Sequence, residues 1–133
     1  MSINMRMLRF EEIGPGELDI LKRGTDKSGH NPLEFRDALM DGTGVMWRVT
    51  GPETDGLVIT QENEYNGRPA LFILYLCGTG AHACMKHVQD TLIEFAKLRG
   101  RELLWARVGI KPHEHISKPL GWDVREYVMV KEI

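Results

Sequence analysis

An apolar run at residues 70–77, ALFILYLC, constrains the fold of this chain more than any other feature of the sequence. The run is far too short to cross a bilayer as a helix, and it is typical of a strand buried on both faces. Residues 85–96 then repeat apolar side chains at helical spacing, and residues 103–108 form a second buried strand pattern. Because a strand, a helix and a strand in succession form a right-handed crossover, the two strands are expected to pair in parallel.

The residues before the apolar run predict antiparallel strands. A strand pattern at residues 57–60 is joined to the run through Asn66-Gly67, a dipeptide that readily takes the positive φ angles of a tight hairpin. Side chains at residues 45–50 alternate between two faces, which predicts a further strand, and those at residues 124–131 alternate in the same way and predict a single last strand. The apolar residues within 5–10 predict a first strand.

Helices are expected between these strands. A short helix from residue 18 should stop near Gly24, with a polar loop at residues 25–30. A second helix should begin with Asn31 as its cap and Pro32 in its first position. The long helix should be closed by Gly100, and residues 113–118 are expected to form a short helix.

Composition bounds the class of protein. With 133 residues, 42% of them hydrophobic and 27% charged, the chain is expected to be one globular domain over residues 1–133. Its N-terminus lacks the apolar segment of a secretory signal, so we expect a cytoplasmic protein with free thiols and no membrane partner. A net charge of −2 argues against nucleic acid as the main partner.

The order of these elements resembles the GNAT superfamily of acetyltransferases over nearly the whole chain. Residues 92–100, LIEFAKLRG, are similar to the end of the family's long third helix, and Leu120-Gly121-Trp122 is similar to its closing Leu-Gly-Phe signature. The resemblance implies an α/β (α+β) fold with a mixed, mostly antiparallel central sheet flanked by helices. It also implies acetyl-CoA as the cofactor, an amine as the acceptor, and no metal.

The resemblance also implies where acetyl-CoA would bind, which is where the central strand passes to the long helix. Exposed backbone amides and the positive helix end meet the pyrophosphate there, and glycine permits that approach. Two residues would offer backbone groups to the pantetheine arm, and five would line the phosphate end: Leu76 and Cys77, then Gly78, Gly80, Ala81, His82 and Ala83.

Two alignments of the family's glycine pattern stay open. Counting back without gaps from Gly100 places the pattern on Gly80, Ala83 and Met85, which puts a thioether where bare backbone should meet the phosphate. If the helix begins about a turn earlier, Gly78-Thr79-Gly80 would form the cradle instead. The gap-free alignment keeps the helix at the family's length and is our expectation.

Acetyl transfer needs a base for the amine and an acid for the departing thiolate. The resemblance places the acid, a tyrosine in the family, at Ser117, which is a weaker proton donor. Glu62 and Glu64 on the expected hairpin are the candidate bases, with Glu62 the first choice, although such residues are often simply solvated.

Other clusters of reactive residues have structural interpretations. His82, Cys84 and His87 are close enough in sequence to suggest zinc, but a fourth ligand is not evident and Cys84 should face the core. Cys77 is interpreted as a buried thiol rather than a nucleophile. Three tryptophans are expected to pack in the interior: Trp47, Trp105 and Trp122.

The layout also resembles small GNAT-like proteins of short-tailed bacteriophages, among them internal virion proteins. That resemblance implies an alternative function as a non-catalytic virion, assembly or DNA-delivery protein. Such a protein would associate with a protein partner or with itself, and would be virion-associated in a host cytoplasm. A third possibility is a sensor that binds acyl-CoA without turnover. The sequence therefore leaves three functions open on one expected fold.

Overall fold

The computed structural model describes residues 3–29, 31–107, 122–125 and 128–133. Seven strands of these residues form one sheet in the order β1-β2-β3-β4-β5-β7-β6. The strands are β1 (Asn4–Leu8), β2 (Gly44–Gly51), β3 (Thr54–Tyr65), β4 (Arg68–Thr79), β5 (Leu103–Arg107), β6 (Asp123–Arg125) and β7 (Val128–Glu132). The helices are η1 (Phe10–Glu12), α1 (Pro15–Ser28), η2 (Pro32–Phe35), α2 (Arg36–Met40) and α3 (Ala81–Leu98).

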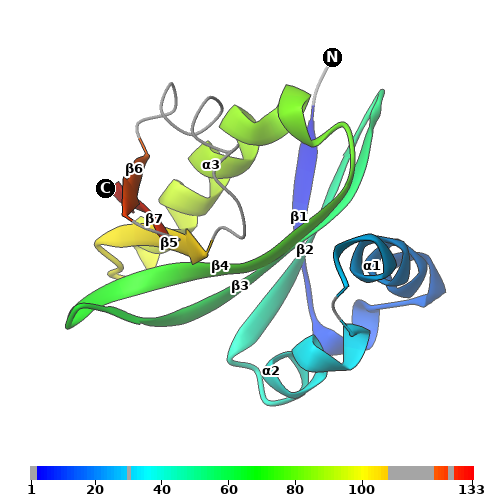
Figure 1. Ribbon diagram of the computed structural model, residues 1–133, viewed down its shortest axis with the longest axis horizontal. Coiled ribbons are helices and arrows are strands. Elements are labelled where there is room, and N and C mark those ends of the chain that lie inside the picture. The colour runs from blue at the N-terminus through cyan, green and yellow to red at the C-terminus, as the bar shows by residue number, and fades with distance from the viewer. Residues whose placement is uncertain (1–2, 30, 108–121, 126–127) are drawn as a thin grey trace.

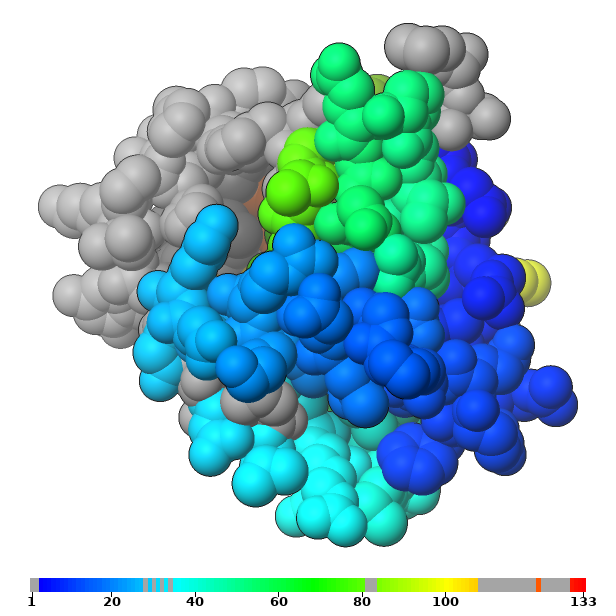
Figure 2. All heavy atoms as spheres, turned by 90° about the vertical axis from the view of Figure 1, so that its right-hand side faces the viewer, coloured from blue at the N-terminus to red at the C-terminus, as the bar shows by residue number. Residues whose placement is uncertain are grey.

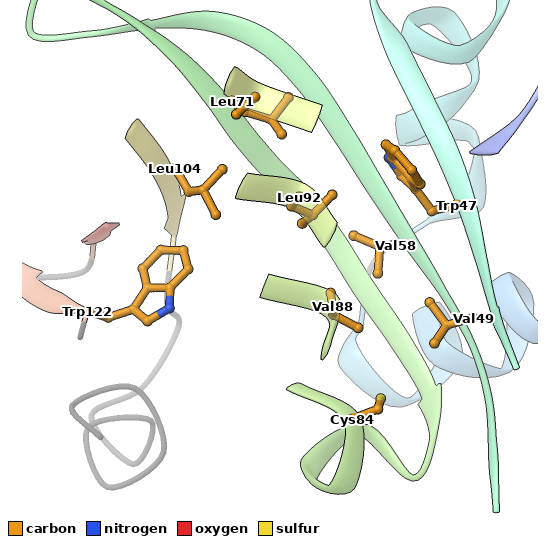
Figure 3. Close-up of a cluster of buried hydrophobic side chains, with 10 residues drawn as sticks. Trp47, Val49, Val58, Leu71, Cys84, Val88, Leu92, Leu104 and Trp122 are labelled. Atoms are coloured by element: carbon orange, nitrogen blue, oxygen red, sulfur yellow. The ribbon is translucent and has the colours of Figure 1, made fainter. Parts of the chain in front are cut away.

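The helices cover the two faces of the sheet separately (Figure 1). On one face α3 packs on the strands around Val58, Val88 and Leu92, which are at most 4% exposed (Figure 3). On the other face α1, η2 and α2 cover a second cluster that includes Leu21, Met46 and further apolar side chains. No helix among the described residues is long and apolar enough to cross a membrane.

The expected arrangement of the strands is confirmed. β4 is the middle strand of the sheet and pairs with β5 in parallel, and every other pair of neighbouring strands is antiparallel. The hairpin between β3 and β4 turns at Asn66 and Gly67, with φ angles of 50° and 78°. The mixed, mostly antiparallel sheet flanked by helices is therefore the fold class that the sequence predicts.

Two boundaries differ from the predictions. The first helix does not stop near Gly24 but continues to Ser28, and Gly29 closes it with a φ of 79°. Gly24 lies inside this helix, where α1 packs directly on Cys77 of β4 and leaves no room for a Cβ. The expected single last strand consists of β6 and β7, which pair antiparallel with each other. Alternation did not distinguish them because both strands have the same two-residue period.

Candidate functional site

The site begins where β4 separates from β5. The two strands pair from Ala70–Leu103 to Ile73–Ala106, and no further pairs follow between described residues, although β4 continues for six more residues to Thr79. A bulge in the ladder with β3 lies at the same point, because Ile59 faces Tyr75 whereas Thr60 faces Ile73. A bulge bends its strand. The second half of β4 therefore has a strand neighbour among the described residues on one side only.

Burial changes at the same point. Ala70, Leu71 and Phe72 are at most 7% exposed, whereas Leu76 is 38% exposed. Since a strand paired on one side leaves alternate backbone groups without ladder partners, some amides and carbonyls of this half of β4 have no strand partner among the described residues. The open edge of β4 is the name used below for residues 74–79.

The open edge leads into α3 through a single residue. β4 ends at Thr79, Gly80 follows with a φ of 74°, and the helix begins at Ala81. Of the three residues that the gap-free alignment names, Gly80 stands directly before α3, and Ala83 and Met85 lie inside the helix. The helix has 18 residues and directly follows Gly78-Thr79-Gly80, the three residues that the alternative alignment names.

Both glycines of the junction are required by packing. A Cβ on Gly80 would overlap the Glu53 carbonyl oxygen and would lie 2.8 Å from Thr54 Oγ1. A Cβ on Gly78 would overlap Gly56 and the Asp55 carbonyl oxygen. In Figure 2 the light-green end of β4 lies against the green segment where β2 turns into β3. The glycine pattern is therefore explained by the close approach of β4 to β3, whether or not a ligand binds.

The amino-terminal turn of α3 has the electrostatic character of an anion site. Gly80 provides no side-chain cap, and the first turn contains no acidic residue. The first amides of a helix have no partners within the helix and carry the positive end of its dipole. The first turn of α3 therefore offers backbone N–H donors of the kind that an anion such as a phosphate accepts, and it directly follows the open edge.

Solved structures match the chain over nearly its full length, whereas no protein-family model and no curated protein sequence matches it. A chain of the NatC complex bound to Gag peptide and CoA matches with a TM-score of 0.74 at 10% identity, covering 100% of this chain and 99% of that one. Aminoglycoside 6'-acetyltransferase type Ii matches with a TM-score of 0.74 at 12% identity, covering 99% and 97%. A protein from Desulfovibrio desulfuricans described as a GNAT-family acetyltransferase matches with a TM-score of 0.67 at 13% identity, and the match covers 98% of this chain and 99% of that one. The chain has the GNAT fold.

Within this GNAT fold, the two residues predicted to serve the pantetheine arm differ in their surroundings. Leu76 is exposed on the open edge. The Cys77 side chain instead faces α1, where its Sγ lies 3.9 Å from the Ile20 carbonyl oxygen, and burial raises the pKa of the thiol to about 11. The interpretation of Cys77 as an unreactive thiol therefore agrees with its place against α1.

Glu62 lies at the other end of α3 from the junction. Its carboxylate accepts hydrogen bonds from Arg99 Nε and Arg101 Nε, each at 3.1 Å. Partial burial by itself would raise the pKa of Glu62, but the hydrogen bonds and charges of the two arginines outweigh it and lower the pKa. Because α3 rises about 1.5 Å per residue, its whole length separates Glu62 from Gly80. The structure does not bring these two predicted site residues together.

Replacement of Glu62 should therefore change stability in a pH-dependent way. The pKa of Glu62 is lowered from its ordinary value of 4.5, so the ion pairs stabilise the fold above that pH and lose their effect as pH falls below it. We expect Glu62→Gln to lose about 1 kcal/mol at pH 7 and to flatten the decline below pH 4.5. Urea unfolding from pH 3 to pH 7 measures this, with Glu64→Gln as the matched control. An equal loss in both variants would contradict the assigned role.

The remaining predicted residues are placed as follows. Ser117 lies outside the described residues. Cys84 is 5% exposed in the core, as expected, whereas His87 on the same helix is exposed, so these two zinc candidates do not face one site. The core positions of the three tryptophans are confirmed, since each is at most 9% exposed: Trp47, Trp105 and Trp122.

Sequence reasoning missed Thr54, which is 7% exposed and packs directly against Gly80 of the junction. It becomes a neighbour of Gly80 only through the register of β2, β3 and β4. No local pattern in the sequence signals such a contact.

Proposed function

We propose that this chain binds acetyl-CoA along the open edge of β4 and the first turn of α3, and transfers the acetyl group to an amine. The observation that carries the proposal is the departure of β4 from β5 after Ile73 and its direct continuation into an uncapped helix start at Gly80. The GNAT fold supports it, and so does the CoA named with the similar NatC chain.

The proposal assigns backbone roles to the predicted residues. The amides at the start of α3 would hold the diphosphate, and the backbone of Leu76 and Cys77 would align the pantetheine arm. Gly78 and Gly80 would keep the backbone close to β3, which leaves the surface free of side chains. When bound, the cofactor supplies an acetyl group activated as a thioester. Glu62 and Ser117 remain the predicted base and acid, and loss of turnover in Glu62→Gln but not in Glu64→Gln would support the first assignment.

A negative charge introduced at the start of α3 tests acetyl-CoA binding. By calorimetry we expect wild-type protein to bind with a Kd of about 1–100 μM. Ala81→Glu should weaken binding about tenfold or more, because a carboxylate there repels the diphosphate. The same change should leave the free protein at least as stable, since acidic residues favour a helix N-terminus.

The neutral variant Ala81→Gln is the matched control and should bind within about threefold of the wild type. Absence of heat from wild-type protein at millimolar acetyl-CoA would remove the proposal. Equal binding by Ala81→Glu and Ala81→Gln would remove the assigned place of the diphosphate.

A non-catalytic assembly or virion role is the second candidate. The ion pairs of Glu62 with Arg99 and Arg101 favour it, because they weaken the first-choice base. This role predicts a stable complex with a partner chain or with a second copy, and no acetylated product. Light scattering that finds a monomer, together with turnover of acetyl-CoA, would contradict it.

A further inference from the structure

Arg107 differs from the other arginines whose side chains the structure describes. Seven of them pair with a carboxylate: Arg6, Arg9, Arg23, Arg48, Arg68, Arg99 and Arg101. Arg36 contacts the sulfur of Met40. Arg107 is exposed and has no carboxylate partner among the described residues, although it is the last residue of a strand whose other members are buried.

Aromatic rings hold the Arg107 guanidinium in place. Its central carbon lies 5.8 Å from the centre of the Phe72 ring and 6.0 Å from that of Trp105. These two rings stack on each other at 4.2 Å, and the Trp105 indole donates a hydrogen bond to Asn63 Oδ1 at 2.9 Å. A guanidinium over aromatic faces keeps its N–H donors available in the plane of the group. Among the described residues, the charge is thus positioned by a rigid aromatic platform and not by a carboxylate.

The position of this guanidinium relates it to the proposed site. Ile73 and Ala106 form the last pair between β4 and β5, and Arg107 is the next residue of β5, so it stands where the strands separate. Strand alternation puts Arg107 on the same face as Trp105, whereas Leu104 faces α3. Figure 1 shows α3 on one face of the sheet. The helices α1 and α2 lie on the opposite face, at the end of the sheet away from β5.

We propose that Arg107 binds a carboxylate or phosphate carried by the amine acceptor, so that the acceptor class is an anionic amine. The inference rests on the proposed function, because it concerns the acceptor of that acyl transfer. With α3 and the diphosphate on one face, an acceptor reaches the separation of β4 and β5 from the opposite face, where Arg107 lies. Arginine suits this role because its planar donors match both oxygens of such an anion.

Pairs of amines that differ only in the anion test the proposal on the full chain. The probes are phosphoethanolamine against ethanolamine, and β-alanine against its amide, titrated by calorimetry with and without CoA. We expect the wild type to bind the anionic member about tenfold or more tightly than its neutral partner. Arg107→Gln should abolish this preference while binding CoA within about twofold of the wild type, and Arg107→Lys should retain part of the preference.

Arg36→Gln is the matched control, because it removes an arginine on α2 that has no carboxylate partner in the part of the chain that the structure describes. It should keep the preference of the wild type. Equal affinity for both members of each pair in the wild type, or an intact preference in Arg107→Gln, overturns the proposal. A preference for succinyl-CoA over acetyl-CoA that Arg107→Gln removes would overturn it too, by assigning the anion to the donor. Anion preference without any CoA binding would instead remove the acetyl-transfer function and leave the anion site.

Discussion

Gly80→Ala is expected to destabilise the protein by about 3–5 kcal/mol, which is a large part of the stability of an ordinary domain. Two causes add. Gly80 has a φ of 74°, and a left-handed conformation costs an alanine about 1–2 kcal/mol. Its new Cβ would also overlap the Glu53 carbonyl oxygen and crowd Thr54, so the junction and the turn between β2 and β3 would have to move apart.

Gly100→Ala separates these two causes. Gly100 has a φ of 71°, and a Cβ there would meet nothing within 4 Å. We therefore expect it to lose only about 1–2 kcal/mol. Urea unfolding of both variants measures the difference between their losses of unfolding free energy, and this difference reports the packing of the junction alone. Similar losses in the two variants would show that the junction does not need the close approach of β4 to β3.

The fold could be predicted from the sequence where local pattern and long-range packing agree. Three segments predict the order and the direction of the central strands: the run at residues 70–77, the Asn66-Gly67 turn and the helix that ends before Gly100. Each of these segments is strongly periodic or has a turn residue with a required φ. Boundaries were less predictable, because β3 and β4 extend well past their most apolar residues at both ends.

The junction between β4 and α3 was predicted, but its contacts were not. The junction between β4 and α3 follows from the order of the elements, and the residues assigned to it, Gly78 and Gly80, lie there. The place of Met85 inside α3 depends on where the helix begins, which an alignment counted back from Gly100 does not use. The ion pairs of Glu62 join residues 37 and 39 positions apart, and no local pattern reports such contacts.

Gly24 shows how a residue that indicates a helix end from sequence can serve packing instead. Glycine in a helix interior lowers helix stability by about 1 kcal/mol relative to alanine, which is why it was interpreted as a stop. In the structure a Cβ on Gly24 would lie 2.6 Å from Cys77 Cβ and 3.3 Å from the Tyr75 hydroxyl. The absence of a side chain thus lets α1 lie directly on the open edge of β4.

Gly24→Ala should therefore reverse the usual sign of a glycine-to-alanine change in a helix. We expect a net loss of about 1–3 kcal/mol, because separating α1 from β4 costs more than the gain in helix propensity. Gly16→Ala in the same helix, where a Cβ meets nothing within 4 Å, should be neutral or stabilising by up to about 1 kcal/mol. Thermal and urea unfolding of both variants measure the contrast. If Gly24→Ala were as stable as Gly16→Ala, α1 would not be held against Cys77, and the high pKa of that thiol would lose its cause.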